Sequence, residues 1–111
     1  MSSDFAERIA ALRRADAAFN LLQTDIVAEK ATSLGHQGRQ MEKALKALRD
    51  FDAHGGGAAE ARLRLVKAAA REVWSFLVQR ELCGLRDQKQ VVAEYAIPGE
   101  VLVRLGAVDR E

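Results

Sequence analysis

The sequence predicts an all-α fold: an elongated helical bundle with a long N-terminal helix, two further main helices and two short C-terminal helices. Helix-favouring Ala, Leu, Arg, Glu, Gln and Lys dominate the 111 residues, whereas aromatic residues make up only 5%. The single proline, Pro98, leaves the chain before it free of the strongest helix breaker. Apolar residues make up 49% of the chain, enough for one continuous core, so we expect residues 1–111 to form a single helical domain.

The first predicted helix runs from about Asp4 to Leu34. Asp4 and Glu7 have the spacing of a capping box, which predicts that the helix starts at Asp4. Behind them an apolar seam recurs about every 3.5 residues, as in a coiled coil. Its members are Phe5, Ile9, Leu12, Ala15, Phe19, Leu22 and Ile26.

The length of this helix implies that the seam needs a cover. At ~1.5 Å per residue the helix is about 46 Å long, whereas a compact domain of this size has a radius of gyration near 13 Å. The part of the seam that extends beyond a compact domain must be covered either by the following helices or by another copy of the chain. We favour a homodimer.

Glycines interrupt the helical pattern at Gly35 and Gly38, and each costs roughly 1 kcal/mol against Ala in a helix interior. We therefore predict a break or kink over residues 35–38, followed by a second helix from about Arg39 to Asp52. The alternative is one very long helix from Asp4 to Phe51. A flexible loop near residues 53–57 comes next, because three consecutive glycines lie there.

The third main helix is predicted from about Ala58 to Cys83, with Gly84 just past its end as a left-handed residue. Its apolar surface is wide, which favours the central and most buried position. Asp87 and Gln90 again have capping-box spacing and predict the start of a short helix. Pro98 fits the first turn of a last short helix.

Charge and cysteine content limit the classes of function. The 17 Lys and Arg residues balance 16 Asp and Glu residues, which predicts no general attraction to nucleic acid or anionic lipid. The lone Cys83 cannot form an internal disulfide and no secretion leader is visible, so we expect a cytoplasmic protein. No apolar run approaches the ~20 residues that span a membrane.

Metal and phosphate sites lack the residues they need. One cysteine and two histidines in separate loops supply no ligand pair at helix or turn spacing. The glycines at 55–57 lack the Lys-Ser/Thr ending and the preceding strand of a phosphate-binding loop. We therefore expect neither a metal nor a cofactor.

Functional groups are densest where the third and fourth helices meet, at Arg80, Glu81, Cys83, Arg86 and Asp87. One interpretation is a small enzyme or anion-binding site, in which an arginine holds an anion and Glu81 or Cys83 acts as base or nucleophile. The other is structural, with ion pairs and caps that lock the two helices together. The structural interpretation is favoured, because the helix dipole opposes a thiolate in the last turn, where Cys83 lies. We assign no catalytic residue.

Two further patterns suggest anionic partners. Residues 92–105 resemble the two helices of a helix-turn-helix, but residues 86–111 carry four basic against five acidic side chains. Recognition helices normally carry an excess of Lys and Arg, so DNA binding by the last two helices stays an alternative only. Arg64, Lys67 and Arg71 share one helical face, for which a solvated surface is the default interpretation and an anionic partner the minor one.

The chain after Trp74 carries a recognisable signature. Its residues are Trp74, 79–81 (QRE), 83–87 (CGLRD), Tyr95, 97–98 (IP), 100–102 (EVL) and 105–107 (LGA). They resemble the C-terminal signature of a small bacterial protein family of unknown function. The resemblance implies a short helical bacterial protein and carries no activity, cofactor or site residues.

Together the long seam, the lack of a catalytic set and the balanced charge favour a non-catalytic helical module. We expect it to self-associate and to present a surface to another protein. The alternatives are a DNA-binding or regulatory protein that uses the last two helices, and a small enzyme or anion-binding protein at residues 80–87.

Overall fold

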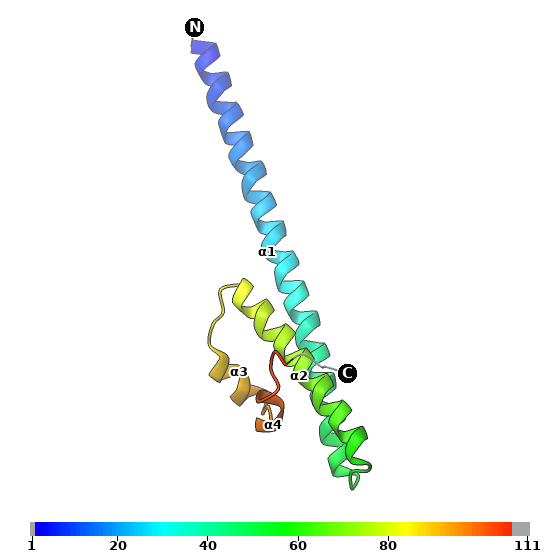
Figure 1. The fold of residues 1–111 in the computed structure, drawn as a ribbon. Coiled ribbons are helices and arrows are strands. Elements are labelled where there is room, and N and C mark those ends of the chain that lie inside the picture. The colour runs from blue at the N-terminus through cyan, green and yellow to red at the C-terminus, as the bar shows by residue number, and fades with distance from the viewer. Residues whose placement is uncertain (1, 108–111) are drawn as a thin grey trace. The chain divides into compact units, whose positions relative to one another are not determined.

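The computed structural model describes residues 2–107, and every regular element within them is an α-helix (Figure 1). The elements are α1 (Ser2–Ala53), α2 (Ala59–Leu82), α3 (Gln88–Glu94) and α4 (Gly99–Leu102). This confirms the all-α class, the long N-terminal helix and the two short C-terminal helices. The chain divides into two units, Met1–Thr32 and Ser33–Glu111.

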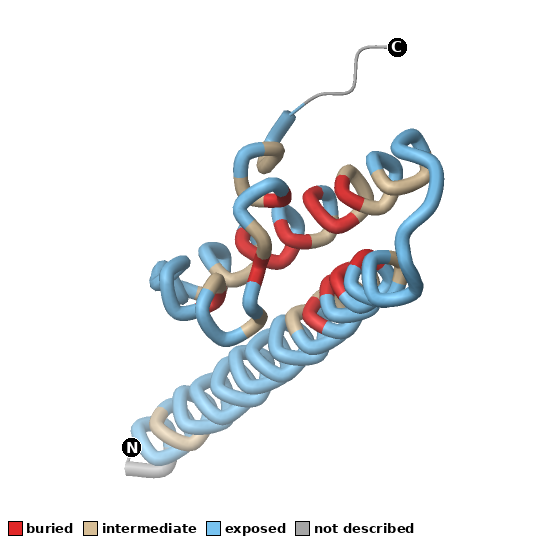
Figure 2. The backbone as a smooth tube through the Cα atoms, turned by 90° about the horizontal axis from the view of Figure 1, so that it is seen from below, coloured by how far each residue is buried: buried red, intermediate tan, exposed pale blue. Residues whose placement is uncertain are grey.

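The first unit consists of the N-terminal part of α1. Its described side chains are exposed except for those of Ile9 and Ala10, which are half-buried (Figure 2). The hydroxyl groups of Thr24 and Thr32 each donate a hydrogen bond to the carbonyl four residues earlier, at 2.9 and 3.0 Å. Their polar groups are therefore satisfied within the helix itself.

The start of α1 differs from the prediction. The helix begins at Ser2, so Asp4 lies in its first turn and does not cap it. The predicted capping box of Asp4 and Glu7 is therefore wrong. An acidic side chain in the first turn is still favourable there, because it faces the positive end of the helix dipole.

No break forms at the two glycines within α1. The helix continues through residues 35–38, and the segment predicted as a separate helix from Arg39 is its C-terminal part. Gly38 is buried, and a Cβ atom there would lie 3.1 Å from Cε1 of Phe76 in α2. Beside it, Nε2 of Gln37 donates to Oε2 of Glu72 at 2.8 Å. Gly38 therefore marks a close approach of α1 and α2 instead of a helix end.

The core of the second unit lies where α2 runs back along the second part of α1, with α3 and α4 beside α2 (Figures 1 and 2). As predicted for a central helix, α2 contributes half of the buried set. The buried hydrophobic residues are Met41, Leu45, Leu48, Val66, Ala69, Ala70, Val73, Phe76, Leu77, Val91, Ile97 and Val101. The ring of Phe76 also meets the ring of Tyr95 edge-on, with centroids 5.7 Å apart.

A residue in the left-handed conformation follows each of α2 and α3. Leu85 N–H donates to the carbonyl of Arg80 at 2.8 Å across Gly84. Gly84 has a φ of 83°, which glycine adopts without strain because it lacks a Cβ atom. The predicted end of α2 is thus confirmed. After α3 the same conformation falls on Ala96, with φ of 49°, which an L-residue adopts at a cost. The connection between α1 and α2, residues 54–58, lies where a loop was predicted.

Arg62 joins three helices of the second unit. Its guanidinium donates to both carboxylate oxygens of Asp52 in α1 and to both of Glu100 in α4, at 2.6 to 2.9 Å. These bonds to Arg62 lower the pKa of Asp52 and the pKa of Glu100. The bidentate geometry fixes the loop end of α1 and α2 against α4.

We expect Gly38→Leu and Gly35→Leu to change stability in opposite directions. At Gly38 the new side chain collides with buried Phe76, which we expect to lower the free energy of unfolding by about 1–3 kcal/mol. At Gly35 only the end of the Arg39 side chain is near, so the better helix former raises it by about 0.5–1 kcal/mol. Urea unfolding of both variants at one protein concentration makes the comparison, and two stabilised variants would contradict the close approach.

We expect the Arg62 cluster to make stability depend on pH. The pKa values of Asp52 and Glu100 are lower in the folded state than in the unfolded state. The contribution of the cluster to stability is therefore complete above the unfolded-state pKa values of ~4, and it is lost as the pH falls through the folded-state pKa values. The stability difference between wild type and Arg62→Met is therefore constant from neutral pH to ~5 and shrinks below ~4. Thermal unfolding across this range measures it. The control Arg64→Met should show no such change, and a pH-independent Arg62→Met difference would refute the linkage.

Candidate functional site

The largest run of exposed apolar side chains follows the N-terminal part of α1. Phe5, Leu12, Phe19 and Ile26 recur every seven residues and are 68%, 64%, 60% and 45% exposed. A second set at the same interval consists of Arg8, Ala15, Leu22 and Glu29. On a helix the two sets form one stripe, which we call the N-terminal seam. It contains the predicted seam residues except Ile9, which follows Arg8 and is half-buried, and it adds Arg8 and Glu29 at its ends. Coiled-coil helices use such a stripe to pack against a partner helix.

Two other exposed apolar residues lie off this seam. Leu21 and Val27 are 67% and 64% exposed, and neither belongs to the two seven-residue sets. Leu21 points away from Phe19 and Leu22, because successive residues of a helix are separated by about 100°. Leu21 therefore provides a matched comparison for the seam.

The residues predicted to cluster between α2 and α3 occupy the ends of these helices. Arg80 places its guanidinium carbon 5.8 Å from the ring centroid of Phe76. Cys83 is the C-cap of α2 and has a half-buried, free thiol. Oδ1 of Asp87 accepts a hydrogen bond from the backbone of Gln90 at 3.2 Å, which confirms Asp87 as the N-cap of α3.

The remaining two residues of that cluster are exposed. Glu81 accepts a hydrogen bond from Gln88 at 3.3 Å, and the carbonyl of Arg86 accepts one from the backbone of Gln88 at 3.0 Å. Within residues 2–107, the ion pairs are made by Lys46 and Arg62, so the ion pairs predicted at this junction do not form. The geometry here is that of caps and short connections, with no nucleophile and base brought together.

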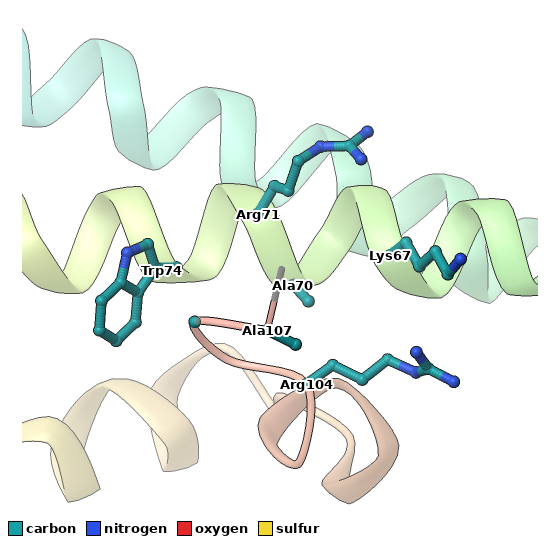
Figure 3. Close-up of a pocket in the computed structure, with 7 residues that line it drawn as sticks. Lys67, Ala70, Arg71, Trp74, Arg104 and Ala107 are labelled. Atoms are coloured by element: carbon teal, nitrogen blue, oxygen red, sulfur yellow. The ribbon is translucent and has the colours of Figure 1, made fainter. Parts of the chain in front are cut away.

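A pocket of about 220 Å³ lies between α2 and the turn after α4 (Figure 3). It is lined by Lys67, Ala70, Arg71, Trp74, Arg104, Gly106 and Ala107. Trp74 is 49% exposed, and a Cβ atom at Gly106 would lie 3.6 Å from its ring. Figure 3 shows Trp74 toward one end of the pocket, and the side chains of Lys67 on α2 and Arg104 after α4 extending toward the other. Cations beside an aromatic ring suit a flat anionic molecule.

Sequence reasoning placed two of the seven lining residues, Lys67 and Arg71, on one basic face. The spacing of Arg64, Lys67 and Arg71 placed a basic face on α2, but Arg64 does not line the pocket. Arg104 joins the site only because the turn after α4 packs onto α2. No local pattern in the sequence signals that contact.

The described part of the chain contains neither a cluster of metal ligands nor a membrane-spanning helix. No three His, Cys, Asp or Glu side chains there gather as metal ligands would. Among the helices of residues 2–107, none is both long and apolar enough to cross a bilayer.

Comparison with known proteins identifies the family. A model of a protein family of unknown function, DUF6665, matches residues 2–111. The chain belongs to DUF6665. This confirms the resemblance to a small helical family of unknown function and transfers no activity. Neither the curated proteins nor the solved structures contain a match to this DUF6665 chain.

Proposed function

We propose that this DUF6665 protein is a non-catalytic assembly module that self-associates as a homodimer through the N-terminal seam, with residues 1–111 acting as one module. The observation that carries the proposal is the seven-residue recurrence of exposed Phe5, Leu12, Phe19 and Ile26. An apolar stripe of this kind marks a surface for another protein. The proposal places the protein in a bacterial cytoplasm, where a lone thiol stays reduced.

The exposed apolar side chains of the seam make the first unit less stable in water than a packed helix. Most helical stability in proteins comes from packing an apolar face against another element. The first unit has the apolar face but buries almost none of it among the described residues. A second copy of the chain supplies a matching seam at equal concentration, and both helices gain the burial.

The other functions considered have less support. The helices of the helix-turn-helix alternative span seven and four residues. At ~1.5 Å per residue, α4 is only about 6 Å long, half the ~12 Å width of a major groove. For catalysis at residues 80–87, the side chains described above serve helix ends and a ring contact instead of facing a common space.

We expect Phe19→Asp to abolish the dimer, because it places a charge in the middle of the seam. The matched control is Leu21→Asp, which puts the same charge two residues away on a side chain of similar exposure but off the seam. Sedimentation velocity at micromolar concentrations should show a monomer for Phe19→Asp and a dimer for Leu21→Asp and wild type. A wild-type monomer would overturn the proposal, as would equal effects of the two substitutions.

A second candidate function is anion binding at the Trp74 pocket, favoured by Arg104, which lines the same pocket as the indole ring. Trp74 is the only tryptophan of the chain, so its fluorescence reports on the pocket directly. Adenosine monophosphate, a flat ring with a phosphate, should quench it saturably, and Arg104→Ala should weaken the binding about tenfold or more. Arg64→Ala, which removes a charge outside the pocket, should not. Quenching without saturation would exclude this function.

A further inference from the structure

We infer that two copies of the chain pair in antiparallel orientation along the N-terminal seam, with Phe19 of each copy against Ala15 of the other. The inference rests on the proposed function and specifies its geometry. A two-fold axis perpendicular to the helices, close to residue 17, relates the copies. Such an arrangement is isologous and closed, so the seam ends in a dimer and does not propagate.

The sizes of the seam residues favour this orientation. In an antiparallel pair, the set Phe5, Leu12, Phe19 and Ile26 of one helix faces the set Arg8, Ala15, Leu22 and Glu29 of the other. The largest side chain at the centre, Phe19, then faces the smallest, Ala15, and Leu12 faces Leu22. In a parallel pair Phe19 would face Phe19 and Ala15 would face Ala15, which alternates crowding with voids.

The charges in the seam favour the same orientation. Arg8 lies near one end of the seam and Glu29 near the other. A parallel pair places Arg8 beside Arg8 and Glu29 beside Glu29, where like charges repel. In the antiparallel pair, Arg8 of each copy lies beside Ile26 of the other, between Asp25 and Glu29. Opposite charges are then close at both ends of the interface, where water still reaches them.

The area of the seam is sufficient for a specific dimer. Phe5, Leu12, Phe19, Leu22 and Ile26 are 45–68% exposed. Their complete burial removes roughly 500 Å² from each copy, or roughly 1,000 Å² in total, about the minimum that a biological interface buries. The two Asp16 side chains approach each other on one flank of the axis, where solvent screens their repulsion.

Thiol crosslinking tests the orientation at two matched positions. Ala11 and Ala18 lie seven residues apart on the same flank of the seam and are both exposed. In the antiparallel dimer the two Ala18 residues lie near the two-fold axis, whereas the two Ala11 residues are about 18 Å apart along the helices. In a parallel dimer the two positions are equivalent. Each is therefore replaced by Cys in a full-length Cys83→Ser background.

A bis-maleimide that spans about 10 Å, the distance between packed helices, serves as the crosslinker. We expect the Ala18→Cys variant to form covalent dimers at least about tenfold faster than the Ala11→Cys variant. Equal rates in two variants that sediment as dimers would overturn the antiparallel inference and leave the proposed function intact. Sedimentation as monomers would instead overturn the proposed function, so the two failures are distinguishable.

Discussion

The second unit depends on the contact between Phe76 of α2 and Gly38 of α1. The missing side chain at Gly38 lets the aromatic ring come so close that a Cβ atom there would lie 3.1 Å from it. The same ring meets Tyr95 edge-on after α3 and lies under the guanidinium of Arg80. One buried side chain therefore positions three parts of the chain, while Arg62 fixes the opposite end of α2 to Asp52 and Glu100 through ion pairs at the surface.

Local patterns in the sequence predict local features well. Composition gives the all-α class, Gly84 the end of α2, and Asp87 the start of α3, since each depends only on nearby residues. The helix break predicted at Gly38 is wrong because helix propensity considers only nearby residues, whereas Phe76, which packs against Gly38, lies 38 residues further along the chain. The Arg104 side of the pocket is invisible for the same reason. Ion pairs at residues 80–87 do not form because Arg80 lies against the ring of Phe76 and Asp87 caps α3, while Glu81 and Arg86 are exposed.

The helix α1 carries two apolar surfaces, of which one is buried and the other is exposed. Its C-terminal part buries Met41, Leu45 and Leu48 in the core of the second unit, so that at most 2% of each side chain stays exposed. Its N-terminal part has a comparable apolar spacing, yet Phe5 and Phe19 remain at least 60% exposed. The residues of the 80–87 cluster form caps and connections at helix ends. The exposed apolar seam is therefore the stronger candidate for a partner-binding surface. Size and charge along it match a second copy in reverse orientation.

The central claim is that a second copy covers the N-terminal seam, and hydrogen exchange of the α1 amides at several protein concentrations tests it most directly. Covering by a second copy makes the protection of residues 5–26 rise with concentration through the micromolar range, because dimerisation follows mass action. Amides around Met41 to Leu48 should stay protected throughout, since their cover lies within the same chain. Rapid exchange of residues 5–26 at every concentration, or protection independent of concentration, would contradict the account.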